Sequence, residues 1–332
     1  MKDLISVIIP FYKVPGIRLR YCIDSFLCQS YKNFELIIVD DGNAMKDYEN
    51  IFSAYEKKDS RIRFVHQENS GVSNARNNGI NQSKGKYIVF CDSDDFVESN
   101  FLESLYSNIL DTDLVICGIA EQWFPVMNSK VDFQYFASKP SLYNWSQYVN
   151  FSVNKIYKKS IIDDYNLRFD TSMQMGEDAL FVCSYIKHCK YVKCISGNLY
   201  HYLWNDFSAM HKYNPIFWDN EKRVIKNQYE LFESFNLSTQ EHNFMNRWLY
   251  IKFKDAFYYY MRMSKNNNET RKVIENILAF DLFNKLINSK IKSNTLFNIH
   301  DKIIVNLWKR FGVRGVFFMK YCSMVKKSLK EI

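Results

Sequence analysis

Short runs of β-branched residues alternate with segments of helical spacing over the first 120 residues of this chain. We expect strands at Ile5–Pro10, Glu35–Asp40, Ile62–His66, Lys86–Cys91 and Leu114–Gly118. The segments between them are expected to be helices: Leu19–Gln29, Ala44–Lys57, Val72–Gln82 and Asn100–Leu110. Such alternation predicts an α/β fold, a mostly parallel sheet with helices on both faces.

Three carboxylates, Asp92, Asp94 and Asp95, directly follow the fourth expected strand. Acids at the end of a buried strand are unfavourable unless they are solvated, paired or bound to a cation. Oxygen ligands of this kind suit Mg²⁺ or Mn²⁺, which often complete their coordination with substrate phosphates. The sequence therefore predicts a substrate that carries a diphosphate.

Other chemical groups fall at the same edge of the predicted sheet, where ligands bind in such folds. Asp41 directly follows the second expected strand, and it is either a turn residue or an acceptor for a ring N–H of a base. The segment from Asn69 to Asn77 opens a helix, whose backbone amides bind anions, and Arg76 adds a charged donor. A capped helix with a solvent-facing arginine is an equally good interpretation of that segment.

Four blocks of this chain resemble family 2 glycosyltransferases of the GT-A (Rossmann-like) fold, in order and in spacing. They are VIIPFY at 7–12, FELIIVDDG at 34–42, GVSNARNNG at 71–79 and DSDD at 92–95. The resemblance covers residues 3–118, and GEDALF at 176–181 is similar to the downstream Glu-Asp motif of the family.

The resemblance implies a metal-dependent, inverting transferase with a nucleotide-sugar donor, most simply a UDP-sugar. It assigns nucleotide-sugar binding to Pro10, Phe11, Tyr12, Asp41, Gly71, Asn74, Arg76, Asp92 and Ser93. It also implies that Asp94, with Asp92, holds Mn²⁺ or Mg²⁺, and that Asp178 is the catalytic base with Glu177 orienting the acceptor. A carboxylate next to another carboxylate tends to have a raised pKa, which suits a base near neutrality.

Two positions depart from the family pattern. Lys13 stands where an asparagine is more common, so contacts near the base are expected to differ. No arginine occurs between Tyr200 and Lys212, and His211 or Lys212 could take over diphosphate contacts.

We expect residues 1–212 to form the GT-A domain, with a nucleotide half at 1–118 and an acceptor half at 119–212. A helix is expected near Glu177–Lys187 and strands at Tyr191–Ser196 and Leu199–Leu203. Residues 213–332 are expected to be mainly helical and to end in a basic aromatic tail. The eight cysteines form no CxxC pair, which favours a reducing cytoplasm, and no apolar run is long enough to span a membrane.

The last 32 residues carry eight Lys or Arg against two acids, interleaved with Trp and Phe. This pattern suits peripheral contact with an anionic membrane, and it equally suits a packed C-terminal helix with a solvated basic face. Residues 244–263 are aromatic on all sides, which suggests a surface for a homo-oligomer or for a lipid acceptor.

The resemblance implies an enzyme of hexosyl or N-acetylhexosaminyl transfer that extends a bacterial surface polysaccharide such as a capsule, or its lipid-linked precursor. The basic tail agrees with a position at the inner face of the plasma membrane. A nucleotidyltransferase is an alternative, although Val7–Val14 has no glycine- and lysine-rich triphosphate loop. A nucleic-acid partner is not expected, because the basic residues concentrate in the tail. A non-catalytic scaffold that binds nucleotide-sugars is the third alternative, and the presence of both Asp94 and Asp178 argues against it.

Overall fold

The computed structural model describes residues 2–120, 131–132, 149–203, 213–235, 238–264, 266–289 and 299–318. The chain divides into two compact units, Met1–Asp206 and Phe207–Ile332, which are described separately. The domain boundary expected from the sequence, after residue 212, lies outside the described residues.

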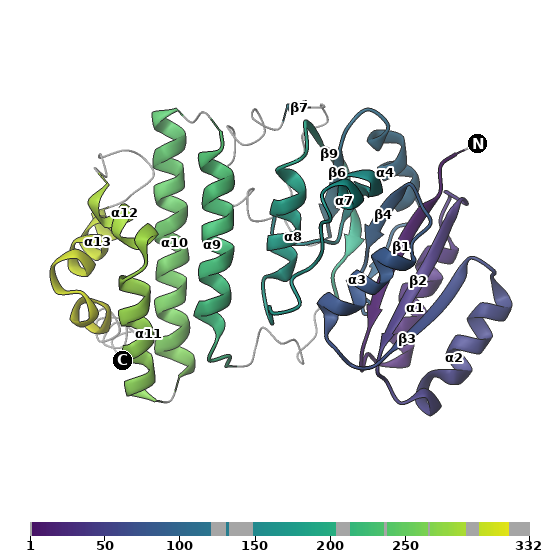
Figure 1. The fold of residues 1–332 in the computed structure, drawn as a ribbon, viewed down its shortest axis with the longest axis horizontal. Coiled ribbons are helices and arrows are strands. Elements are labelled where there is room, and N and C mark those ends of the chain that lie inside the picture. Colours follow the sequence, from purple (N-terminus) through teal and green to yellow (C-terminus); the bar gives the residue numbers. More distant parts are fainter. Residues whose placement is uncertain are drawn as a thin grey trace, which may run out of the picture. The chain divides into compact units, whose positions relative to one another are not determined.

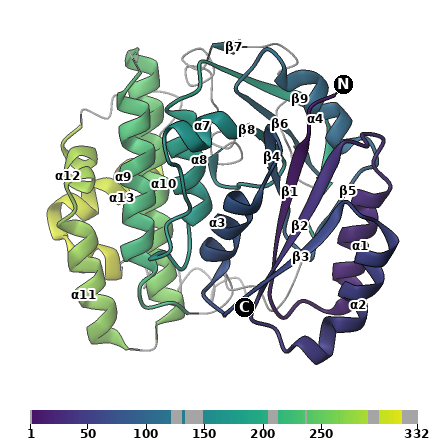
Figure 2. The ribbon, with the colours of Figure 1, turned by 45° about the vertical axis from the view of Figure 1, so that its right-hand side comes forward.

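The first unit is built on a sheet whose strands run in the order β3-β2-β1-β4-β8-β6-β9-β5 (Figure 1; β5 and β8 are labelled in Figure 2). Four neighbouring strands are parallel, and their bounds are β1 Ile5–Phe11, β2 Phe34–Asp41, β3 Ile62–Gln67 and β4 Tyr87–Phe90. All residues of β1 and β4 are buried, as expected for strands covered on both faces. The expected α/β fold is confirmed, and the acidic strand ends meet at one edge.

Beyond β4 the sheet is mixed. The strand β8 (Lys155–Lys158) lies antiparallel between β4 and β6 (Leu114–Ile119). The strand β9 (Tyr191–His201) runs parallel to β6 and pairs antiparallel with the short strands β5 (Phe96–Val97) and β7 (Val131–Asp132). Two separate strands were expected where β9 is continuous, because a glycine, Gly197, stands between them. In the structure Gly197 adopts a φ of 106° and the strand continues through it.

Helices cover both faces of this sheet, as Figure 2 shows for α3 on one side and for α1 and α2 on the other. The bounds are α1 Gly16–Leu27, α2 Met45–Lys58, α3 Val72–Gln82, α4 Phe101–Ile109, α7 Lys159–Asp164 and α8 Glu177–Ile186. The face with Ile5, Val7 and Ile9 packs on α1, α2 and α4. Gly79 of α3 lies against Ile8 on the opposite face, where a side chain at position 79 would clash. The helix α8 covers that same face, because its Phe181 contacts Phe90.

The second unit consists of helices in the part that the structure describes: α9 Phe217–Glu233, α10 Thr239–Met263, α11 Asn267–Leu278, α12 Asp281–Asn288 and α13 Ile299–Phe311. The long helix α10 contacts α9, α11 and α12. Its Trp248, Tyr250, Phe253 and Phe257 are therefore buried, and the expectation of an aromatic surface over 244–263 is wrong. Within the described residues, no helix combines the length and apolarity that crossing a bilayer requires.

Candidate active site

A pocket lies at the carboxyl ends of β1, β2 and β4. It is lined by Pro10, Phe11, Tyr12, Asp41, Asn69, Gly71, Val72, Ala75, Asp92, Ser93 and Asp94. The topology explains this gathering, since parallel strands deliver their ends to one edge. Tyr12 is 41% exposed and forms an open part of the wall, whereas Phe11 is buried against Tyr48.

The Asp41 carboxylate is held by the loop that enters α3. Its Oδ1 accepts hydrogen bonds from Gln67 Nε2 at 2.8 Å and from the Ser70 backbone N–H at 2.9 Å. Its Oδ2 accepts from the Gly71 N–H at 2.9 Å. A carboxylate offers about four acceptor positions, so little capacity remains for a base. Asp41 lines the pocket, and its carboxylate is hydrogen-bonded to the loop before α3.

Two asparagines that the sequence interpretation missed connect the strand ends. Asn43 bonds through Nδ2 to Asp40 Oδ1 at 2.5 Å and to the Phe11 carbonyl at 3.1 Å, and its Oδ1 accepts from the Lys13 N–H at 2.7 Å. Asn69 donates to the Asp41 carbonyl at 2.8 Å. Lys13 has a φ of 51°, a left-handed conformation that asparagine adopts more readily than lysine. No sequence signal beyond turn composition pointed to these two side chains.

The start of α3 is shaped by Gly71, whose φ of 92° favours glycine at this position. Asn74, in the first turn, donates to the Ser70 carbonyl at 2.7 Å and is not among the residues that line the pocket. Asn74 is thus placed beside the site.

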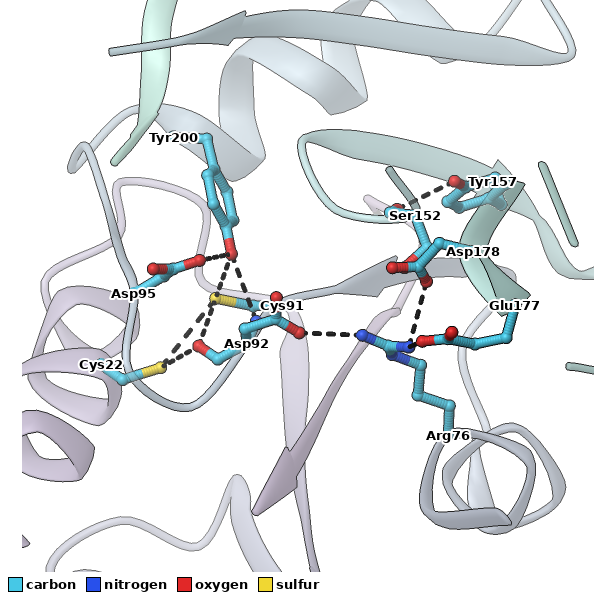
Figure 3. A network of polar contacts seen from close by, with 10 residues as sticks. All are labelled: Cys22, Arg76, Cys91, Asp92, Asp95, Ser152, Tyr157, Glu177, Asp178 and Tyr200. Carbon is cyan, nitrogen blue, oxygen red and sulfur yellow. Dashed lines mark hydrogen bonds and ion pairs between the residues drawn. The ribbon is translucent and has the colours of Figure 1, made fainter. Parts of the chain in front are cut away.

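Arg76 connects the nucleotide side of the site to the downstream Glu-Asp motif. Its Nη2 lies 3.0 Å from Asp92 Oδ1, and its Nη1 lies 3.1 Å from Glu177 Oε1 and 3.0 Å from Asp178 Oδ1. The guanidinium is buried, with its centre 5.2 Å from the Phe169 ring centroid. Figure 3 shows it between Asp92 on one side and the two acids of α8 on the other. The alternative of a solvent-facing arginine is wrong, because α8 covers the face from which Arg76 projects.

The pKa values at this cluster reflect burial and opposing charges. Burial by itself would lower the pKa of Arg76, but Asp178, Asp92 and Glu177 together raise it. Burial raises the pKa of Asp178 to about 7, Arg76 acts against that rise, and the charge of Glu177 adds to it. A carboxyl group with such a pKa can accept a proton near neutral pH. Its side chain is 21% exposed, so a substrate can reach it.

Asp92 and Asp94 have the donor chemistry of ligands for a hard divalent cation. Both line the pocket, and 36% and 23% of their side chains are exposed. Two accessible carboxylates that line one pocket fit Mg²⁺ or Mn²⁺, which bind through one or two carboxylates and substrate oxygens. Arg18 Nη1 lies 3.9 Å from Asp94 Oδ2 and partly balances its charge. Among the described residues, no group of three or more His, Cys, Asp or Glu is placed to hold a metal ion.

Asp95 has a different role from its neighbours. It is buried, and it accepts hydrogen bonds from Tyr200 Oη at 2.6 Å and from the Leu203 N–H at 2.9 Å. The Tyr200 hydroxyl in turn accepts from the Asp92 N–H at 3.2 Å. Burial, with the nearby charge of Asp92, raises the pKa of Asp95 to about 8. Asp95 therefore ties the acidic strand end to β9. His211 and Lys212 lie outside the described residues.

Together the parallel strand ends, the start of α3 and the accessible acids after β4 form an arrangement typical of the GT-A fold. The comparisons with known proteins agree. The profile described as "Glycosyl transferase family 2" matches residues 6–165. The chain is 31% identical over 249 residues to the putative glycosyltransferase EpsH of Bacillus subtilis strain 168, covering 72% of this chain and 70% of EpsH.

A second relative is the poly(ribitol-phosphate) beta-N-acetylglucosaminyltransferase TarP of Staphylococcus aureus strain N315. It is 31% identical over 212 residues, which cover 62% of this chain and 64% of TarP. Among solved structures, S. aureus TarS 1-349 in complex with UDP-GlcNAc matches with a TM-score of 0.68 and 17% identity, over 94% of this chain and 89% of that chain. This last likeness is one of fold.

The chain belongs to glycosyltransferase family 2. Its expected enzyme class, a glycosyltransferase, is confirmed.

Proposed function

We propose that this enzyme transfers a sugar from a UDP-sugar to a hydroxyl of a glycan or lipid-linked glycan, with inversion at the anomeric carbon. The observation that carries the proposal is the position of Arg76, because one buried guanidinium touches the donor-side Asp92 and both acids of α8. The names of TarP, an N-acetylglucosaminyltransferase, and of TarS in complex with UDP-GlcNAc support an N-acetylhexosamine donor and a surface polymer as product.

In this mechanism Asp178 accepts the proton of the acceptor hydroxyl as that oxygen attacks the anomeric carbon. Glu177 keeps the pKa of Asp178 raised and orients the acceptor, while Arg76 fixes both carboxylates relative to Asp92. Attack from the face opposite the departing diphosphate inverts the anomeric centre. Asp94 and Asp92 would hold Mn²⁺ or Mg²⁺, which when bound stabilises the negative charge of the leaving nucleotide.

A thermal-shift panel tests the proposal. UDP-sugars with Mn²⁺ should raise the Tm, since ligands that bind only the folded state stabilise it. With a radiolabelled UDP-sugar, the label should then be found in free sugar released by hydrolysis or in the product formed with an added acceptor. A nucleotidyltransferase would respond to a nucleoside triphosphate with a sugar phosphate instead. A scaffold would bind the donor without hydrolysing it. Absence of any response to UDP or UDP-sugars contradicts the proposal.

We further propose contact between the C-terminal region and an anionic membrane at the cytoplasmic face. Ile303, Phe311 and Phe318 are 52%, 56% and 53% exposed, and they are the large apolar side chains exposed in the described part of the second unit. The sequence from 302 to 318 contains four Lys or Arg and no acid. Exposed apolar groups among cations favour an anionic interface. Trp308 and Val316 of the same segment are buried.

A further inference from the structure

The pocket at the strand ends has a surplus of negative charge. Among the residues that the structure describes, its lining includes three carboxylates, Asp41, Asp92 and Asp94, and no Lys, Arg or His. The diphosphate of a nucleotide-sugar brings further negative charge, and a single divalent cation does not offset both the diphosphate and these acids. Like charges held close together repel, so a further cation from the protein would favour binding of the diphosphate.

The charge of Arg76 is already taken up by acids. Its side chain is only 4% exposed, and its guanidinium lies 3.0 Å from Asp92, 3.1 Å from Glu177 and 3.0 Å from Asp178. Three carboxylates exceed the charge of one arginine. Turning Arg76 toward a phosphate would leave carboxylates unpaired at a buried place, which is unfavourable. A further cation therefore has to come from another element.

Arg18 lies at the same edge of the sheet, in the first turn of α1. This helix begins at Gly16, shortly after β1 ends at Phe11, so its first turn stands beside the carboxyl end of β1. Arg18 Nη1 lies 3.9 Å from Asp94 Oδ2, which is beyond hydrogen-bond length, so the two side chains form a charge pair. The Arg18 side chain is 30% exposed, and a guanidinium offers a planar fork of N–H donors that matches phosphate oxygens. A phosphate beside Asp94 is therefore within reach of Arg18.

The fold does not depend on this arginine. A partly exposed charge pair of this length contributes little to stability. The helix α1 is held on the sheet by its apolar face, whose buried residues are Leu19, Cys22, Ile23 and Phe26. Arg18 can therefore change partners without loosening the helix.

We propose that Arg18 binds the diphosphate of the nucleotide-sugar, as a cation that α1 contributes to the pocket next to Asp94. When the bond between the anomeric carbon and the diphosphate oxygen breaks, its electron pair stays on that oxygen. The Arg18 guanidinium donates hydrogen bonds to the phosphate oxygens and balances this developing charge. The inference rests on the proposed function and adds a leaving-group contact to it. No residue of α1 was assigned to the site from the sequence.

Calorimetric titration of the full chain with uridine, UMP and UDP in MnCl₂ tests the proposal. Arg18→Met should raise the Kd of UDP about tenfold, the usual effect of losing one hydrogen bond to a charged group. The Kd of uridine should not change, because uridine has no phosphate, and the Kd of UMP should change less than that of UDP. The loss should be the same at low and at high MnCl₂, because it depends on a side chain and not on metal occupancy.

Arg20→Met is the matched control. Arg20 is exposed on the same helix, and the centre of its guanidinium lies 6.0 Å from the Tyr55 ring centroid. This variant removes the same charge and should leave all three Kd values unchanged. Arg18→Lys keeps the positive charge without the planar fork, so it should recover part of the UDP affinity that Arg18→Met loses.

A wild-type Kd for UDP in Arg18→Met would overturn the proposal. An equal loss of uridine affinity would also overturn it, since that result indicates a damaged pocket, and an equal loss in Arg20→Met would indicate an effect of net charge alone. If high MnCl₂ abolished the loss, Arg18 would act on the metal and not on the diphosphate. If the wild type binds neither UDP nor a UDP-sugar, the proposed function itself fails, whereas UDP binding that is independent of Arg18 removes only this inference.

Discussion

The guanidinium of Arg76 lies 3.0 Å from the Asp178 carboxylate, although the two residues are more than 100 positions apart in the chain. Both project from helices on the same face of the sheet, α3 and α8. Through its other nitrogen Arg76 reaches Asp92, 3.0 Å away at the donor pocket. One side chain thus fixes the distance between Asp92 of the pocket and the acid proposed as the base.

Replacing Arg76 by methionine should lower the free energy of unfolding by roughly 3 kcal/mol, because the variant leaves carboxylates unpaired at a buried site. Arg76→Lys should lose less of the free energy of unfolding, because it keeps the positive charge. Its single ammonium group cannot contact Asp92 and the acids of α8 at the same time. Chemical denaturation measures both. The partly exposed pair of Arg63 and Glu35, whose side chains are 36% and 16% exposed, is the control, and Arg63→Met should change stability by less than about 1 kcal/mol. Equal losses in Arg76→Met and Arg63→Met would show that Arg76 is not structurally central.

The base should titrate near neutrality, because the pKa of Asp178 is raised to about 7. The turnover rate should therefore fall as the pH drops below 7. Glu177→Gln removes a negative charge that raises this pKa, so its acid limb should move to lower pH. Asp178→Asn should bind UDP normally and lose transfer. A pH profile of wild-type and variants checks this, and near-normal turnover in Asp178→Asn would eliminate it as the base.

Asp94→Asn should abolish the effect of Mn²⁺ on UDP affinity, because a neutral amide is a poor ligand for a hard cation. Titration calorimetry with and without MnCl₂ measures the effect. Asp95→Asn is a matched control one residue away, since Asp95 bonds Tyr200 and Leu203 rather than facing the pocket. A retained Mn²⁺ effect in Asp94→Asn would remove this residue from the metal site.

The stability of the protein should fall as the pH rises from about 4 to 8 to the extent that Asp95 contributes. Its pKa is raised from 3.8 to about 8 in the folded state, so the folded protein keeps a proton that the unfolded chain releases. Asp95→Asn is neutral in both states and should show a flatter dependence of Tm on pH. The exposed Asp164→Asn should leave the slope unchanged. An unchanged slope in Asp95→Asn would contradict the raised pKa.

The triple variant Ile303→Ser, Phe311→Ser, Phe318→Ser should no longer sediment with phosphatidylglycerol vesicles. The wild type should bind these vesicles better than phosphatidylcholine ones, and added salt should weaken the binding. Leu110→Ser with Tyr165→Ser, which alters exposed apolar residues of the first unit, is the control. Vesicle binding that survives the triple substitution would reject this surface, and a change from dimer to monomer would assign it to self-association.

Much of the nucleotide half could be predicted from the sequence, because its buried parallel strands are continuous apolar runs bounded by clear turn residues. The expected helix Val72–Gln82 agrees with α3 at both ends. The strand β8 was missed because it has only four residues and both its first and its last residue, Lys155 and Lys158, are lysines. Lysine is not typical of a buried strand. The continuity of β9 was missed for a similar reason, at Gly197.

The site shows the same division. Its residue types and strand-end positions could be predicted, but not which acid bonds to which partner. Asp95 stands in a row with Asp92 and Asp94, and only its contact with Tyr200, 105 residues later, separates its role from theirs. In the second unit, an all-round aromatic helix could not be assigned to core or surface without knowing how many neighbours surround it.

The hydrogen bonds from the Ser70 and Gly71 amides to Asp41 have a thermodynamic consequence for the donor. The loop Asn69–Gly71 at the start of α3 is ordered when the protein folds. A nucleotide that binds beside it therefore does not have to supply the free energy of ordering this loop. Affinity on this side of the pocket should therefore come from preorganisation instead of induced fit.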